Sequence, residues 1–192
     1  DGTLIFPAVT KTGIQVMTTN MILDSDDTPV IWRGPMVANI LKQFYTDVYW
    51  DDVDYMFVDM PPGTGDIQLS IAQNFKLSGA VIVTTPQKVA LADVRRSAMM
   101  FKHEGVNVPI LGLVENMAYF TPSDMPEKKY YIFGEGHGKE FAEELNIPLI
   151  AQIPIDENIA IAGDKGAPYT FNNFGPVHAA FEKLARSIIE KF

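Results

Sequence analysis

The chain has 192 residues, of which 47% are hydrophobic, and its formal net charge is −9. This length and apolar content suffice for one hydrophobic core and predict a single domain over residues 1–192. The negative charge, with lysine and arginine scattered along the chain, argues against nucleic acid and anionic membranes as partners, and no apolar run is long enough to span a bilayer.

Cysteine is absent from the sequence, so these residues supply neither a disulfide nor a thiolate ligand for a metal or cluster. A chain of this composition is expected in the cytoplasm. The sequence opens with Asp1 and two further residues typical of turns, and we expect a further segment upstream of them in the intact protein.

The N-terminal part of the chain predicts a hairpin and a helix. Residues 4–19 are expected to form a short hairpin or edge pair that turns at residues 11–13. Residues 34–44 are expected to be helical, with Pro35 at the first position, where its missing amide proton costs nothing.

Short runs rich in valine, isoleucine and leucine are expected to form strands buried on both faces, at residues 55–58, 80–83, 110–114 and 149–153. Helices are expected between them, at residues 66–75, 91–103 and 139–145. Asp66 is the N-cap candidate of the first helix, and Gly105 follows the second as a C-cap residue. The alternation predicts an α/β fold with a doubly wound, mostly parallel sheet flanked by helices.

Two later segments stand apart from this alternation. Residues 118–138 form the longest expected loop, and loops of that length in compact domains are usually functional or mobile. Residues 177–192 place apolar side chains on one face of an expected helix. The mixed charges on its other face favour a helix that packs on the core over one that docks on a membrane.

The segment at residues 55–66 carries the strongest indication of a binding site. An apolar strand is expected to deliver Asp59 at its carboxyl end, and two prolines and Gly63 follow. Strand ends of this kind bind ligands in α/β proteins, and this one offers a carboxylate for Mg²⁺, directly or through water, and an amide that can approach a terminal phosphate. A strand-ending aspartate that only caps a turn is the alternative interpretation of Asp59.

Motifs in several parts of the chain resemble those of one family. They are Trp-Arg-Gly-Pro-Met at residues 32–36, Asp-Met-Pro-Pro-Gly-Thr-Gly-Asp at residues 59–66, Thr-Thr-Pro-Gln at residues 84–87 and Val-Glu-Asn-Met at residues 114–117. Together they resemble the Mrp/ApbC branch of the MinD/ParA-like ATPases, from about Ile31 to Gly166. The resemblance implies a deviant-Walker, P-loop NTPase-like protein that binds ATP and Mg²⁺, forms a homodimer, and carries iron–sulfur clusters to apoproteins.

The resemblance also implies roles for four residues. Asp59 is then the Walker B residue that helps to hold Mg²⁺, and Gly63 belongs to the switch that senses the terminal phosphate. Asn116 then contacts the adenine base, and the backbone near Pro154 closes over that base. The alternative interpretations are an asparagine that only forms a turn and an Asp156 that only caps the next helix.

The sequence departs from the family pattern in lacking the phosphate-binding loop Lys-Gly-Gly-x-Gly-Lys-[Ser/Thr]. Gly138 and Lys139 are followed by Glu140, and Phe133 stands where the motif needs its first glycine, so a helix start is expected there instead. Without the loop's amides and lysine, we expect these residues alone to bind ATP weakly and not to hydrolyse it. ATPase activity is expected only in an intact chain that supplies the loop.

A second departure concerns the iron–sulfur cluster. Many members of the family carry a Cys-x-x-Cys pair soon after the asparagine motif, whereas residues 119–126 of this chain contain no cysteine. Thiolates are the usual ligands of such clusters. The sequence therefore offers no iron–sulfur ligand of this kind, and the carrier function is implied by the resemblance alone.

Two other functions are compatible with the sequence: a ParA/MinD-like ATPase switch, and a scaffold without a P-loop that binds a partner. The acidic charge argues against the membrane or DNA binding that the switch predicts. His103, His137 and His178 have unrelated spacing, and we expect no metal site from them. Arg33 and Asp93 are candidate interface or switch residues.

Overall fold

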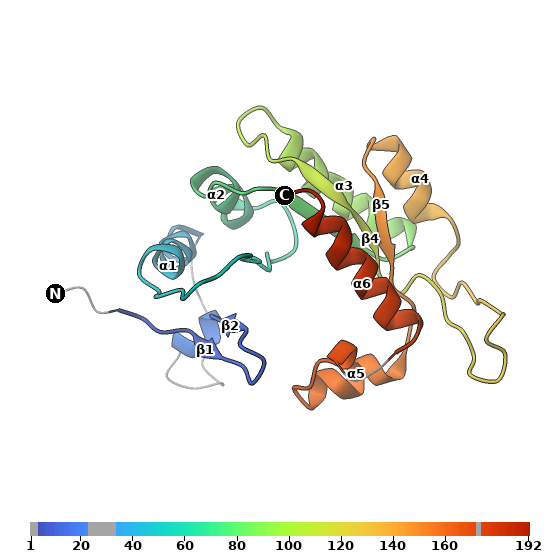
Figure 1. The fold of residues 1–192 in the computed structure, drawn as a ribbon. Coiled ribbons are helices and arrows are strands. Elements are labelled where there is room, and N and C mark those ends of the chain that lie inside the picture. The colour runs from blue at the N-terminus through green and yellow to red at the C-terminus, as the bar shows by residue number, and fades with distance from the viewer. Residues whose placement is uncertain (1–3, 23–33, 172–173) are drawn as a thin grey trace. The chain divides into compact units, whose positions relative to one another are not determined.

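The computed structural model describes residues 4–22, 34–171 and 174–192 (Figure 1). Trp32 and Arg33 of the first family motif therefore lie outside the described residues. The chain divides into two compact units, Asp1–Phe75 and Lys76–Phe192, each with its own internal packing.

The N-terminal unit contains a small antiparallel sheet and two α-helices. Its elements are β1 Ala8–Val9, β2 Gln15–Val16, the 3-10 helix η1 Thr19–Ile22, α1 Gly34–Thr46 and α2 Asp66–Asn74. The amide of Thr10 donates to the carbonyl of Ile14 (2.9 Å) across the turn, and Gly13 has a φ of +86°, which glycine adopts without strain. The predicted hairpin and both predicted helices of this unit are confirmed.

Helix α2 is capped differently from the expectation. Gly65, with an extended backbone and no side-chain cap, is the N-cap, and Asp66 is the first helical residue. In the first turn the carboxylate of Asp66 still lies where the helix dipole favours a negative charge.

The strand predicted at residues 55–58 is wrong. These residues have no regular secondary structure, and their side chains are between 43% and 74% exposed. A β-strand is stabilised by hydrogen bonds to a neighbouring strand, and within the described part of the chain residues 55–58 pair with none. The apolar run is therefore present without the partner that would make it a strand.

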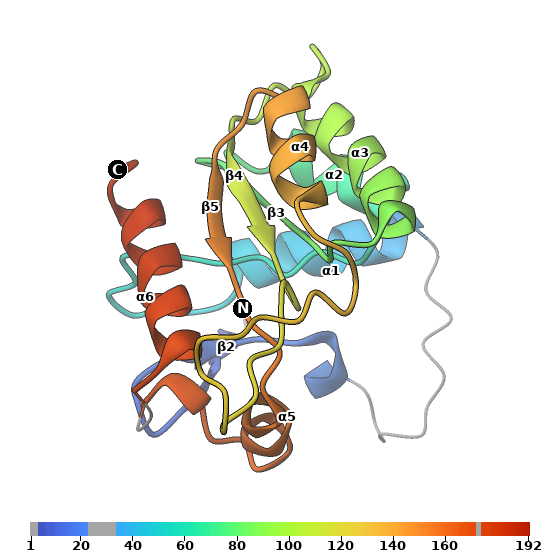
Figure 2. The same cartoon turned by 90° about the vertical axis from the view of Figure 1, so that its right-hand side faces the viewer.

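The C-terminal unit is built on a parallel sheet with the order β3-β4-β5. Its strands are β3 Ala80–Thr84, β4 Ile110–Glu115 and β5 Leu149–Gln152. Its helices are α3 Lys88–Lys102, α4 His137–Glu144, α5 Glu157–Asp164, the 3-10 helix η2 Tyr169–Phe171, and α6 Pro176–Ile189. Figure 2 shows α3 and α4 on one side of the sheet and α6 on the other. The predicted α/β class, with a parallel sheet flanked by helices, is confirmed.

The details of this unit refine the expected boundaries. Helix α3 begins after Gln87, earlier than expected, and its C-cap is His103 rather than Gly105. Helix α4 includes Gly138 and Lys139, which confirms that this pair begins a helix. Helix α5, for which no range was predicted from the sequence, begins after Asp156, and its N-cap is the Asp156 of the alternative interpretation.

The core is packed tightly around the middle strand β4. Val114, Ile150 and Ile153 form a buried cluster, and Phe181 and Leu184 of α6 pack against it. Gly112 leaves no space: a Cβ atom there would lie 2.5 Å from Cγ2 of Ile150. The terminal helix therefore packs on the core as predicted.

Asp156 caps helix α5 and supports a prediction about pH. Its Oδ1 accepts hydrogen bonds from the amide (2.9 Å) and side chain (2.9 Å) of Asn158, and its Oδ2 accepts one from the Tyr169 hydroxyl (3.0 Å). Burial is the largest single influence and raises the pKa of Asp156, but these hydrogen bonds together lower that pKa below its ordinary value.

Replacing Asp156 with alanine is expected to lower the free energy of unfolding by about 1 kcal/mol at pH 7. Because the folded-state pKa is lowered, the charge stabilises the fold above the unfolded-state pKa, and this contribution is lost as the pH falls through the folded-state pKa. Urea unfolding at pH 7 and pH 3 measures both values, with Asp164→Ala on the same helix as the control. A deficit of equal size at both pH values would contradict this account.

Within the described ranges, no helix is both long and apolar enough to cross a membrane. No group of three or more histidine, aspartate or glutamate side chains could hold a metal ion among the residues that the structure describes.

Candidate functional site

The carboxyl ends of the three parallel strands hold one group of predicted site residues, in the C-terminal unit. In parallel sheets, ligands bind at this edge. Asn116 directly follows β4, and its amide donates to the carbonyl of Thr84 at the end of β3 (2.7 Å). Pro154 follows β5 closely, and between the two strands the amide of Ala118 donates to the carbonyl of Ile153 (2.9 Å). The structure therefore brings Asn116 and Pro154 to neighbouring strand ends.

The conformation at Asn116 is a tight turn. Its side-chain Oδ1 accepts a hydrogen bond from the amide of Met117 (2.9 Å), and Met117 has a φ of +55°, which is unfavourable for a residue other than glycine, asparagine or aspartate. Strained backbone of this kind is common where a side chain is aimed at a ligand. With Oδ1 engaged in the turn, the Nδ2 protons are the donors through which Asn116 could bind a further group.

The loop after Asn116 is anchored by contacts near its base, and most of its residues from 123 to 136 are exposed. Phe120 pairs with Tyr130 as an antiparallel bridge and with Ile155 as a parallel bridge. Tyr119 lies between Lys129, whose Nζ is 4.0 Å from the ring centroid, and Tyr131, whose ring packs edge-on. These contacts fold the loop into a hairpin beside the end of β5.

Glu115, the last residue of β4, is a buried carboxylate with two hydrogen-bond donors. Its side chain is 2% exposed. The amide of Gly138 in helix α4 donates to Oε1 (3.0 Å), and Nε2 of Gln152 in β5 donates to Oε2 (2.6 Å). Burying a carboxylate is costly unless donors satisfy it, and these two groups do so.

The N-terminal unit holds the other group of predicted site residues, Asp59 and Gly63. Asp59 is exposed, and Gly63 has a φ of +102°, which disfavours any side chain there. Gln68 of α2 is buried and donates through Nε2 to the carbonyls of Pro61 (3.0 Å) and Pro62 (2.8 Å). The helix thus braces the prolines that separate Asp59 from Gly63.

The predicted site residues therefore fall into two groups. Asn116 and Pro154 lie together in the C-terminal unit, and Asp59 and Gly63 lie on one short segment of the N-terminal unit. Arg33 is outside the described residues, and Asp93 forms an exposed ion pair with Arg96 on α3.

Sequence reasoning missed Glu115 and Gln68 as structural parts of these two groups. The sequence signal for each was weak. Glu115 is a polar residue inside one of the family motifs, and Gln68 is a polar residue on an otherwise apolar face of its helix.

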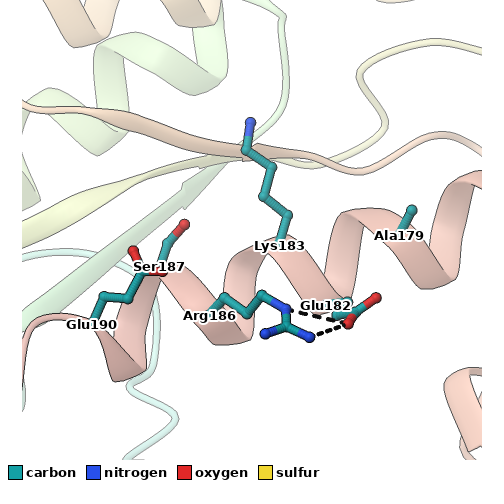
Figure 3. Close-up of a pocket in the computed structure, with 6 residues that line it drawn as sticks. All are labelled: Ala179, Glu182, Lys183, Arg186, Ser187 and Glu190. Carbon is teal, nitrogen blue, oxygen red and sulfur yellow. Dashed lines mark hydrogen bonds and ion pairs between the residues drawn. The ribbon is translucent and has the colours of Figure 1, made fainter.

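The C-terminal unit has surface hollows along α6 and between α3 and α4, and the latter includes His137, which lies beside the end of β3. One runs along the exposed face of α6 and is lined by that single helix (Figure 3), with Ala179, Glu182, Lys183, Arg186, Ser187 and Glu190. The guanidinium of Arg186 donates to the carboxylate of Glu182 and lowers its pKa. This face has the properties of a solvated helix surface rather than of a ligand site.

Comparison with known proteins gives a consistent result. The family described as ParA, NUBPL iron-transfer P-loop NTPase, matches residues 1–189. An iron-sulfur cluster carrier protein from Aquifex aeolicus is 48% identical over 180 residues, which is 93% of this chain and 48% of that protein. This chain thus spans about half the length of that relative.

Solved structures agree with the fold. The nucleotide-binding protein from Archaeoglobus fulgidus, in complex with ADP, superposes with a TM-score of 0.71 and 33% identity, over 91% of this chain and 69% of that one. The cell division ATPase MinD from Pyrococcus furiosus superposes with a TM-score of 0.56 over 82% of this chain and 59% of that one, but at 22% identity it supports the fold alone. The resemblance found in the sequence is thereby confirmed for the family and the fold.

Proposed function

The chain belongs to the family of NUBPL iron-transfer P-loop NTPases, and on that basis we propose that it is the greater part of an ATP-dependent iron–sulfur cluster carrier. The observation that carries the proposal is the pair Asn116 and Pro154 at neighbouring carboxyl ends of a parallel sheet. A nucleotide base bound there would lie at the edge where α/β proteins hold ligands.

For the base, we propose Asn116 as the polar contact and the backbone near Pro154 as the cover. The Nδ2 protons of Asn116 can donate to a purine nitrogen while Oδ1 keeps its bond to the Met117 amide.

For the phosphates, we propose Asp59 as the Walker B carboxylate and Gly63 as part of the switch. Magnesium in nucleotide sites needs few protein ligands, because phosphates and water complete its coordination. The single exposed carboxylate of Asp59 fits this requirement, directly or through water. When bound, Mg²⁺ neutralises charge on the phosphates. The backbone at Gly63, held by the Gln68 brace next to it, can approach the terminal phosphate because no side chain intervenes.

The phosphate-binding loop itself does not occur among these 192 residues. We propose that it lies outside them, and that the two units together with this loop make one nucleotide-binding domain. Hydrolysis of ATP would then be an activity of the longer protein. We further propose a homodimer in the cytoplasm, with iron–sulfur apoproteins as the receiving partners.

In this proposal the iron–sulfur cluster is the cargo of the protein, and its ligands are distinct from the nucleotide-binding residues. No cysteine is present in the sequence, so thiolates for a cluster would also have to come from outside these residues. The A. aeolicus relative is named as a carrier, and this chain covers 48% of it.

The proposal is tested by anaerobic reconstitution with iron and sulfide. The 192-residue chain is expected to bind no thiolate-ligated cluster, whereas a longer version of the protein that supplies cysteine residues is expected to bind one and pass it to an apoprotein. The visible absorption of the cluster reports loading, and activity of a cluster-dependent enzyme reports transfer. An extended protein that hydrolyses ATP but takes up no cluster would refute the carrier function and leave the ATPase.

A further inference from the structure

Glu115 stands out because it is a fully buried charged side chain directly beside Asn116. Its carboxylate lies between two elements distant in sequence, accepting from the amide of Gly138 (3.0 Å) and from Nε2 of Gln152 (2.6 Å). An apolar residue of similar size would fill the same space without any cost of burying charge. The geometry therefore invites an explanation beyond packing.

The space around the carboxylate is shaped for it. Gly138 lacks a side chain at the point of contact, and a Cβ atom built there would overlap Oε1 and lie 2.7 Å from Cδ of Glu115. The first turn of α4 can approach the strand end only because residue 138 is glycine. A helix N-terminus also favours a negative charge, so the carboxylate and α4 stabilise each other.

The backbone of the same residues holds the Asn116 turn from both sides. The amide of Asn116 donates to Thr84 of β3 (2.7 Å), and the amide of Ile153 donates to the carbonyl of Glu115 (2.9 Å). These bonds fix the turn within the plane of the sheet. The side chain of Glu115 adds a contact out of the plane of the sheet, because it ties the turn to α4, which packs on one face of the sheet.

The far end of the long loop is fixed at the same place. His137, the first residue of α4, donates through Nδ1 to the carbonyl of Pro86 (2.9 Å), next to the Gly138 amide that Glu115 holds. The loop that leaves at Ala118 thus returns to the strand ends at residues 137 and 138. Loosening Glu115 would release the loop's return and the turn together.

We propose that Glu115 is a positioning residue for base recognition: its buried carboxylate clamps α4 and β5 to the end of β4 and so holds the Asn116 side chain toward the base. This inference rests on the proposed nucleotide function. It predicts that losing the clamp lowers base preference more than affinity for phosphate groups. The reason is that Asn116, the residue that Glu115 positions, would contact the base and not the phosphates.

Glu115→Gln keeps the shape but removes the charge and half of the acceptor capacity. The matched variant Glu115→Gln with Gln152→Glu moves the carboxylate to the other partner, where the new amide at position 115 can accept from Gly138 and donate to the new carboxylate at position 152. Glu143→Gln, an exposed change on α4, controls for charge. We expect the single variant to lose about tenfold in preference for Mg-ATP over Mg-GTP, the exchanged pair to recover most of it, and the control to match the parent.

The experiment uses a longer version of the protein that supplies a phosphate-binding loop. Tripolyphosphate measures phosphate binding alone. Amide hydrogen exchange at residues 116–118 measures the stability of the turn without any nucleotide. Faster exchange and lost base preference in Glu115→Gln, with unchanged tripolyphosphate affinity and recovery in the exchanged pair, support the clamp. Unchanged base preference, or equal losses for tripolyphosphate and ATP, would overturn it. If the parent binds tripolyphosphate but shows no base preference, the positioning role fails although phosphate binding stands. If the parent binds no nucleotide at all, the proposed function fails first and this inference with it.

Discussion

Asp59→Asn is expected to lower the rate of ATP hydrolysis by roughly 100-fold or more in a version of the chain that includes a phosphate-binding loop. The carboxylate would help to hold Mg²⁺ against the phosphates, and a neutral amide of the same size holds a divalent cation poorly. Because Asp59 is exposed, the free energy of unfolding is expected to stay within about 0.5 kcal/mol of the parent. Steady-state phosphate release and urea unfolding measure the two quantities.

A neighbouring acidic residue supplies the control for Asp59. Asp54 is also exposed and lies ahead of the apolar run on the same segment, so Asp54→Asn removes an equal charge without touching the predicted ligand. It is expected to leave hydrolysis unchanged. Equal rates for the two variants would show that Asp59 holds no ligand and only caps a turn, which is the alternative interpretation of this residue.

Asn116→Asp is expected to reduce the preference for Mg-ATP over Mg-GTP by about tenfold or more. The substitution keeps an oxygen that can accept from the amide of Met117, so the turn survives, but it removes the Nδ2 protons that would meet the base. Titration calorimetry with both nucleotides measures the ratio of dissociation constants, and thermal unfolding checks that the turn is intact.

Asn116→Ala separates recognition from folding. It removes the turn's acceptor as well as the donors, and it leaves Met117 in its unfavourable conformation without that hydrogen bond. We expect both variants to lose base preference and only the alanine variant to lose stability, by about 1 kcal/mol. If the aspartate variant kept the parent's preference, Asn116 would be a turn-forming residue and nothing more.

The parts of the fold that the sequence predicted well are those whose signal is local. The strands β3, β4 and β5 follow from short apolar runs, and the helices between them follow from helical spacing and from polar residues at their ends. The hairpin before α1 likewise follows from turn residues. In each case the residues that decide the structure are near neighbours along the chain.

The predictions that were wrong or incomplete depend on contacts between residues that are distant along the chain. Residues 55–58 have the composition of a buried strand, but a strand also needs a neighbouring strand to pair with. The local sequence does not show whether such a strand is present. The start of helix α5 at Asp156 was given only as an alternative interpretation, and its length was not predicted.

The same distinction between local signals and distant contacts applies to the candidate site residues. Asn116 could be proposed because it follows an apolar strand and belongs to one of the family motifs, and Pro154 because it follows another apolar strand within the region of resemblance. Glu115 was missed because its donors, Gly138 and Gln152, are 23 and 37 residues further along the chain. The packing of α4 and β5 on β4 creates that contact, so the residues around Glu115 alone do not reveal it.

The central claim, that these residues form most of an ATP-binding domain, is tested most directly by isothermal titration of Mg-ATP. The titration compares the 192-residue chain with a longer version of the protein that supplies a phosphate-binding loop. We expect weak or no binding by the shorter chain and micromolar or tighter binding by the longer one, because only the latter would carry the phosphate-binding loop. Absence of binding by both would contradict the claim, remove the roles proposed for Asp59, Gly63 and Asn116, and favour a scaffold that binds a partner.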